Sequence, residues 1–174
     1  MKALSRNKQT FYYALYKEYA PVYDTNGYRT GEKAVTYENI VRMRGNISAA
    51  RGTADLEQFG IEVNYNKTIV LAGTDYPFKE DTVFWIGFGE VKEFSSTSAY
   101  DKGTYIIHGG KMYYAKNEVT AGNWKSADWA DVAYNYVVSA IAVSLNSTTI
   151  AVREVHYAPS NPNTTPPPPP ASET

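Results

Sequence analysis

The sequence predicts an all-β protein: a small β-barrel with an inserted small β module and a proline-rich C-terminal tail. Tyrosine is unusually frequent, with 16 Tyr beside 6 Phe and 3 Trp among 174 residues. Tyrosine combines an apolar ring with a polar hydroxyl, so it suits strands that have one buried and one solvent-exposed face. Apolar and polar residues also alternate with a period of two in several short segments. Helical heptads are absent, so no coiled coil is expected.

The first hairpin is predicted near the N-terminus. Residues 11–23 are rich in aromatic side chains, and the segment 24–27 supplies turn residues ending in Asn-Gly, which tolerates the positive φ angles of tight turns. We expect the returning strand at 33–37, with a loop that reaches Gly31. The alternation of apolar and polar residues over 41–47 then predicts a half-buried strand.

Further strands are predicted at 68–72 and 83–88, separated by a turn at 73–77. The segment 134–145 forms the first strand of a second hairpin, and 149–157 returns after the turn at Asn146. Strict alternation predicts two faces for the first of these strands. One face holds Tyr134, Tyr136, Val138, Ala140 and Ala142, and the other holds Val137, Ile141, Val143 and Leu145.

The chain is long enough for one hydrophobic core. We expect residues 1–97 to form the first part of the barrel, 98–131 the inserted module, 132–158 the last hairpin and 159–174 the tail. The tail has five consecutive prolines, which favour an extended polyproline helix and cannot join a sheet. It is either a disordered terminus or an arm ordered against a neighbouring subunit.

Composition argues against several functional classes. The chain has no cysteine, which rules out disulfides, thiolate zinc sites and thiol catalysis. Its two histidines, His108 and His156, are too few for a multi-histidine metal site and lie far apart in the sequence. We therefore expect no enzyme, no cofactor and no metal. The least polar stretch, 137–143, is far shorter than the roughly 18 apolar residues of a membrane helix, so no membrane span is expected.

Charge is nearly balanced overall, with a formal net charge of −1, but it is unevenly distributed. Residues 1–53 are basic and residues 54–101 are acidic. Opposite patches on one surface would let identical copies attract each other head to tail. Alternatively, the charges mix on the folded surface.

Several motifs occur in an order and spacing that resemble a known family. They are RNKQTFYYALY at 6–16, YD with the following glycine and TGE at 23–32, NISAARG at 46–52, EQFG at 57–60, YNYVV at 134–138 and SLNS at 144–147. Together they resemble the head-closure proteins, also called head-tail connectors or stoppers, of long-tailed bacteriophages. The chain departs from this family in the segment 87–131, which separates strands that follow each other closely in the resembling proteins.

The resemblance implies a homo-oligomeric ring in the neck of the virion, assembled in the host cytoplasm. The ring would lie between a portal or adaptor protein on the capsid side and a tail terminator or tail completion protein on the tail side. It would close the DNA-filled capsid and provide the surface on which the tail docks. Genomic DNA would pass through the lumen without sequence-specific binding, and no membrane is involved.

The polar segment 48–60 is the candidate channel or gating loop, because small residues and glycine let a loop move while strands hold its ends. Inward carboxylates would repel DNA phosphates, whereas many inward arginines would slow DNA passage. The segment is predicted to be a loop or to contain one short helix at 54–59. The alternative to a channel loop is a loop that binds the adaptor or is merely exposed. The candidate residues are Ser48, Ala50, Arg51, Gly52, Asp55, Glu57, Gln58 and Gly60.

The segment 99–130 resembles the small chitin-binding-like modules found on phage tail and fibre proteins. Tyr113, Tyr114, Trp124 and Trp129 are candidates for a glycan or partner platform, because exposed aromatic rings stack on the apolar faces of sugars. The chain would then be a virion accessory protein that binds carbohydrate. Alternatively, these rings form the core of a module that has no disulfide or metal. An intermediate arrangement buries Trp129 and exposes Trp124. In a ring, the module is expected to project outward.

Overall fold

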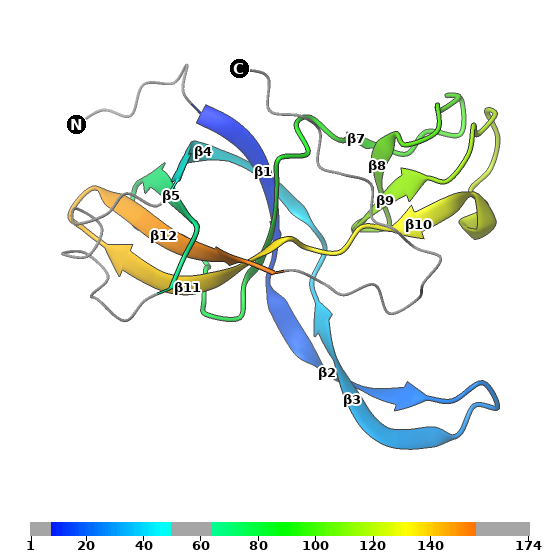
Figure 1. Ribbon diagram of the computed structural model, residues 1–174, viewed down its shortest axis with the longest axis horizontal. Helices are drawn as coiled ribbons and strands as arrows, with labels where there is room; N and C mark the ends of the chain where they lie inside the picture. Colours follow the sequence, from blue (N-terminus) through cyan, green and yellow to red (C-terminus); the bar gives the residue numbers. More distant parts are fainter. Residues whose placement is uncertain (1–7, 50–63, 156–174) are drawn as a thin grey trace.

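The computed structural model describes residues 8–49 and 64–155 and confirms the predicted all-β class. Six strands close into a barrel, accompanied by a four-stranded and a two-stranded sheet (Figure 1). The order around the barrel is β1-β4-β5-β12-β11-β6, and every neighbouring pair is antiparallel. The bounds are β1 Lys8–Ala14, β4 Val41–Ala49, β5 Lys67–Ala72, β6 Val83–Ile86, β11 Tyr136–Val143 and β12 Ser147–Glu154. The predicted tail lies outside the described residues.

Apolar side chains fill the barrel. Phe11, Ile69, Phe84, Ile150 and Val152 are fully buried and belong to one hydrophobic cluster inside it. Strand β4 contributes Gly45 at the point where it lies closest to this cluster. A Cβ atom there would lie 2.7 Å from a methyl group of Leu71, so a larger residue would not fit without a shift. Since six strands enclose only enough space for side chains, the barrel of a single copy is a packed core and not a pore.

The second hairpin forms as predicted, but the strict alternation predicted along β11 is wrong beyond Val138. The pairing passes from Val138 opposite Val152 to Ala140 opposite Ala151, so Ser139 is the extra residue of a β-bulge. One extra residue exchanges the two faces of the strand. As a result Ile141 packs against the same barrel cluster as Val138, instead of lying on the opposite face.

A first hairpin forms from β2 (Tyr16–Tyr23) and β3 (Arg29–Tyr37), and it extends away from the barrel (Figure 1). Residues 11–14 of the predicted aromatic arm are not part of it, because they belong to the barrel strand β1. The loop of the hairpin ends before Arg29 and does not reach Gly31. The tight turn is closed by Asp24, whose carboxylate accepts hydrogen bonds from the backbone nitrogens of Asn26 and Tyr28 at 2.9 and 2.8 Å. This Asx-type capping explains why the loop is shorter than the composition suggested.

The inserted segment forms the four-stranded sheet, in the order β10-β9-β8-β7. Its bounds are β7 Lys92–Glu93, β8 Tyr105–His108, β9 Lys111–Ala115 and β10 Trp129–Asp131, with a short 3-10 helix η2, Ser126–Asp128, before β10. The first of these strands pairs in parallel with β8, so the sheet starts six residues before the expected boundary at residue 98.

The small sheet packs on the outer face of the barrel. Tyr12 and Trp85, which point outward from β1 and β6, form a buried cluster with Ile107 and Met112 of the small sheet. The indole nitrogen of Trp85 donates a hydrogen bond to the carbonyl of Val132 at 2.8 Å. The barrel therefore has an apolar layer on each side of the β1 and β6 backbone, and the insertion is fixed to it by packing and hydrogen bonds.

Candidate functional site

The structure describes the first residue of the candidate channel loop, Ser48, and places it within β4. Its hydroxyl lies 2.8 Å from that of Thr68, its partner on β5, and the next pair is Ala49 opposite Lys67. Strands β4 and β5, which precede and follow the segment in the sequence, are thus paired up to the last residue of β4 and the first residue of β5. The remaining candidates lie outside the described residues: Ala50, Arg51, Gly52, Asp55, Glu57, Gln58 and Gly60.

The chain is fixed to the barrel at residues 64–66, where the described part resumes. The backbone nitrogen of Asn66 donates to the carbonyl of Val152 at 2.9 Å, and its side-chain oxygen accepts from the backbone nitrogen of Glu154 at 2.7 Å. The hydroxyl of Ser139, at the bulge of β11, donates to the carbonyl of Asn64 at 2.9 Å. The chain therefore rejoins the barrel through contacts with both β11 and β12.

Three of the four candidate aromatic residues meet on one face of the small sheet. Trp129 is buried, and the ring of Trp124 is stacked on it at 5.3 Å and 11°. Tyr113 contacts Trp124 edge-on at 5.0 Å. With their neighbours these residues form what we call the aromatic cluster, consisting of Phe94, Tyr100, His108, Tyr113, Trp124 and Trp129.

Trp124 is half-buried and is held by other side chains. His108 stacks on its ring at a centroid distance of 4.1 Å, in addition to the stacking on Trp129, and Phe94 meets it edge-on at 5.3 Å. A sugar platform needs a ring face open to solvent. The geometry therefore favours a structural use of Trp124 and Trp129 within the module.

Tyr114 lies apart from the aromatic cluster. It follows Tyr113 on β9, so it points to the opposite face of the sheet. There its ring lies 6.5 Å from that of Tyr105, which in turn packs edge-on against Phe88 at 5.1 Å. The four candidates consequently do not form one continuous platform.

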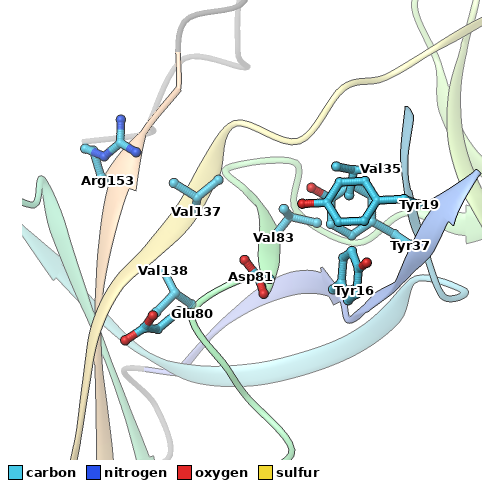
Figure 2. A pocket seen from close by; sticks show the side chains of 10 residues that line it. All are labelled: Tyr16, Tyr19, Val35, Tyr37, Glu80, Asp81, Val83, Val137, Val138 and Arg153. Atoms are coloured by element: carbon cyan, nitrogen blue, oxygen red, sulfur yellow. The ribbon is translucent and has the colours of Figure 1, made fainter. Parts of the chain in front are cut away.

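The sequence did not point to a groove of about 230 Å³ between the first hairpin and the barrel. Figure 2 shows three tyrosines gathered at one end of it and Arg153 at the other. The hairpin contributes Tyr16, Tyr19, Val35 and Tyr37; the barrel contributes Val83, Val137, Val138 and Arg153; and the turn before β6 contributes Glu80 and Asp81. The aromatic run was visible in the sequence, but the angle at which the hairpin leaves the barrel was not.

The groove combines apolar walls with a few charged groups. Tyr19 remains 60% exposed, whereas Val83 is buried. Loss of contact with water raises the pKa of Tyr16 above its ordinary value, and the nearby Tyr19 and Asp81 act in the same direction. The phenol of Tyr16 therefore remains protonated at neutral pH and can donate a hydrogen bond.

Comparison with known proteins gives no relative: no family model, curated protein or solved structure matches the chain. Within residues 8–49 and 64–155, no group of three or more His, Asp or Glu side chains is arranged to hold a metal ion. In the same part of the chain, no helix is long and apolar enough to cross a membrane. The function proposed below therefore depends on the sequence motifs and on the packing of the barrel.

Proposed function

We propose that this chain is a structural component of a phage neck. Copies would form a ring between the portal or adaptor and the tail, close the DNA-filled capsid and provide the surface on which the tail docks. The proposal starts from the resemblance of the motifs to head-closure proteins. The observation that carries it is the closed barrel with a packed interior and a hairpin that extends away from it (Figure 1).

The packed interior of the barrel excludes a DNA channel within a single copy. Phe11, Phe84 and Ile150 occupy the interior with no exposed surface, so DNA cannot pass through one copy. A channel must then be enclosed by several copies around a common axis. Identical subunits close such a ring through two different surfaces that meet head to tail.

The first hairpin offers one of these surfaces. Tyr23 and Tyr28 are 59% and 74% exposed on it. Tyrosine is enriched at protein interfaces, because its ring buries a large apolar area while its hydroxyl finds a partner. A two-stranded hairpin is also only marginally stable by itself in water, so contact with a neighbouring subunit would stabilise it.

The partners of the ring are proposed as the portal or adaptor on one side and the tail terminator or tail completion protein on the other. Genomic DNA passes through the shared lumen without sequence-specific contacts. The segment 48–60 is the proposed gate, since it lies between strands β4 and β5, which pair with each other up to Ala49 and Lys67.

Deletion of residues 50–55 tests the gate. In particles assembled with the deletion variant, we expect packaged DNA to leak out while the variant still folds and joins the particle. A deletion of equal length at 169–174 serves as the control and should retain DNA. Measurement of nuclease-protected DNA per particle compares the two, and full DNA retention in both would contradict the proposed gating role.

A further inference from the structure

The proline-rich tail and the tyrosine-lined groove have no assigned role in the proposed neck function. The tail has five consecutive prolines at 166–170 and lies outside the described residues. The groove is a formed feature between the first hairpin and the barrel, and it is lined by three tyrosines and four valines (Figure 2).

The chemistry of the groove suits a proline-rich peptide. A polyproline helix has no internal hydrogen bonds, and its rings dock between aromatic side chains of a shallow groove. Its free carbonyl groups need donors, and the hydroxyls of Tyr16 and Tyr19 and the guanidinium of Arg153 are donors of this kind. Because residues 159–172 carry no charged side chain, the carboxylates of Glu80 and Asp81 do not repel them.

The described part of the chain ends beside the groove. The strand β12 ends at Glu154, one residue after Arg153, which lines the groove and is paired with Val137, another groove residue. The backbone nitrogen of Val155 donates to the carbonyl of Asn135 at 2.9 Å, which holds the chain beside β11 where the described part ends.

The chain that follows Val155 is long enough to extend along a groove that begins at Arg153. When extended, the chain from Val155 to Pro166 reaches up to about 35 Å. A tether of this length also gives a local concentration on the order of millimolar, so that weak contacts suffice for binding.

We propose that this groove binds proline-rich polypeptide in the extended polyproline conformation, and that its occupant is segment 159–174 of the same molecule. The bound segment covers Tyr19 and Val35, which are 60% and 43% exposed in the described part of the chain. This intramolecular contact does not depend on the neck function and exists in the isolated protein.

Paramagnetic labelling of the full chain tests the proposal. Because the chain has no cysteine, Ala171→Cys introduces a single site for a nitroxide. We expect loss of amide peak intensity at Tyr19, Val35 and Val137, which line the groove. The peaks of Val143, at the opposite end of β11, and of Leu145, in the turn that follows it, should be unchanged. An unlabelled synthetic peptide with the sequence of residues 159–174 should restore the lost intensity in competition.

Matched variants separate groove binding from general disturbance. Tyr19→Ala should abolish the intensity loss, whereas Tyr23→Ala, which removes an equally exposed tyrosine outside the groove, should preserve it. Replacement of residues 166–170 by serine should also abolish it. Equal intensity loss in all variants, or none in the labelled parent chain, would overturn the proposal.

Mixing tests whether the tail binds its own molecule. Nitroxide-labelled chains without ¹⁵N are combined with unlabelled ¹⁵N chains, so that only contacts between molecules broaden the peaks. Intramolecular binding predicts no intensity loss in this mixture. Intensity loss at the groove residues in the mixture would show that the tail occupies another copy, which contradicts the proposed occupant.

Discussion

The hydroxyl of Tyr12 accepts a hydrogen bond from the backbone nitrogen of Val91 at 2.6 Å and donates one to the carbonyl of Gly89 at 3.1 Å. Tyr12 belongs to the barrel, and its side chain is fully buried between β1 and the inserted segment. Desolvation raises its pKa, so the phenol remains a neutral donor across the physiological range. This one side chain links the insertion to the barrel by both packing and hydrogen bonding.

Replacement of Tyr12 by Phe should therefore lower the free energy of unfolding by about 1–3 kcal/mol, because it leaves the buried nitrogen of Val91 without its acceptor. Urea unfolding measures this change. Tyr23→Phe, on the exposed part of the hairpin, is the control and should change stability by less than about 0.5 kcal/mol. Equal effects of the two substitutions would show that the hydrogen bond does not hold the insertion in place.

The turn between β8 and β9 contains two glycines with different surroundings. Gly109 and Gly110 both have positive φ angles, +56° and +76°, so alanine at either position costs roughly 1–2 kcal/mol of backbone strain. A Cβ atom at Gly110 would also lie 2.7 Å from the Cβ of Asn39, and closer still to its amide group, whereas one at Gly109 meets no atom within 4 Å.

We expect Gly110→Ala to destabilise the protein clearly more than Gly109→Ala, because the added Cβ atom would clash with Asn39. The resulting shift would also disturb the hydrogen bond that the carbonyl of Gly110 accepts from the nitrogen of Ile40 at 2.9 Å. Thermal unfolding of both variants provides the comparison. Asn39→Gly should recover part of the loss in the Gly110→Ala variant but none in the Gly109→Ala variant. Indistinguishable melting temperatures of the two glycine variants would contradict the close packing of Gly110 against Asn39.

Alkaline pH should destabilise the barrel through Tyr136. Burial, together with the negative charge of Glu154, raises its pKa to about 12, against an ordinary value of 10.0. The folded state binds the phenol proton of Tyr136 more tightly than the unfolded state does. The contribution of this proton to the free energy of unfolding is therefore complete below pH 10 and is lost as the pH rises through 12. The loss amounts to about 2–3 kcal/mol.

Urea unfolding at pH 9 and at pH 11.5 checks this contribution. Other tyrosines with raised pKa values act in the same sense, so the informative quantity is the difference between the parent chain and Tyr136→Phe. We expect a smaller alkaline loss of stability in the variant. A parallel decline in both proteins would contradict the assigned burial of the phenol.

Trp124 should act as a structural residue of the inserted module. Trp124→Ala removes the ring that stacks on both His108 and Trp129, so we expect a loss of stability on the order of 2–4 kcal/mol. Tyr114→Ala, on the opposite face of β9, serves as a comparison outside the aromatic cluster. A glycan array examines the alternative role, and sugar binding by the parent chain that Trp124→Ala abolishes would favour the carbohydrate-binding function.

The sequence predicted the elements that depend on local patterns. Period-two alternation identified β4, and the Asn-Gly and Asn-Ser turns identified both hairpins. The bulge at Ser139 could not be predicted, because it depends on pairing with β12 and on the contact with Asn64. The intermediate arrangement proposed for the two tryptophans was right about Trp129, whereas Trp124 is half-buried by rings that are distant in sequence.

The groove between the first hairpin and the barrel could not be predicted from local sequence patterns either. Its tyrosines come from one hairpin, but Val83, Val137 and Arg153 come from three barrel strands. Local patterns can identify each strand, yet the groove depends on the angle between the hairpin and the closed barrel, which tertiary packing sets. The candidate site on segment 48–60 was identified from composition alone, and only Ser48 of that set lies in the described part.

Electron cryomicroscopy of virions that carry this chain tests the central proposal most directly. The account predicts a ring of copies at the junction of the portal and the tail, with DNA density on the axis between the copies and none inside an individual barrel. Gold labelling of a tagged chain gives an independent position for the same density. Location of the chain on fibres, on the baseplate or outside the particle would contradict the proposed function.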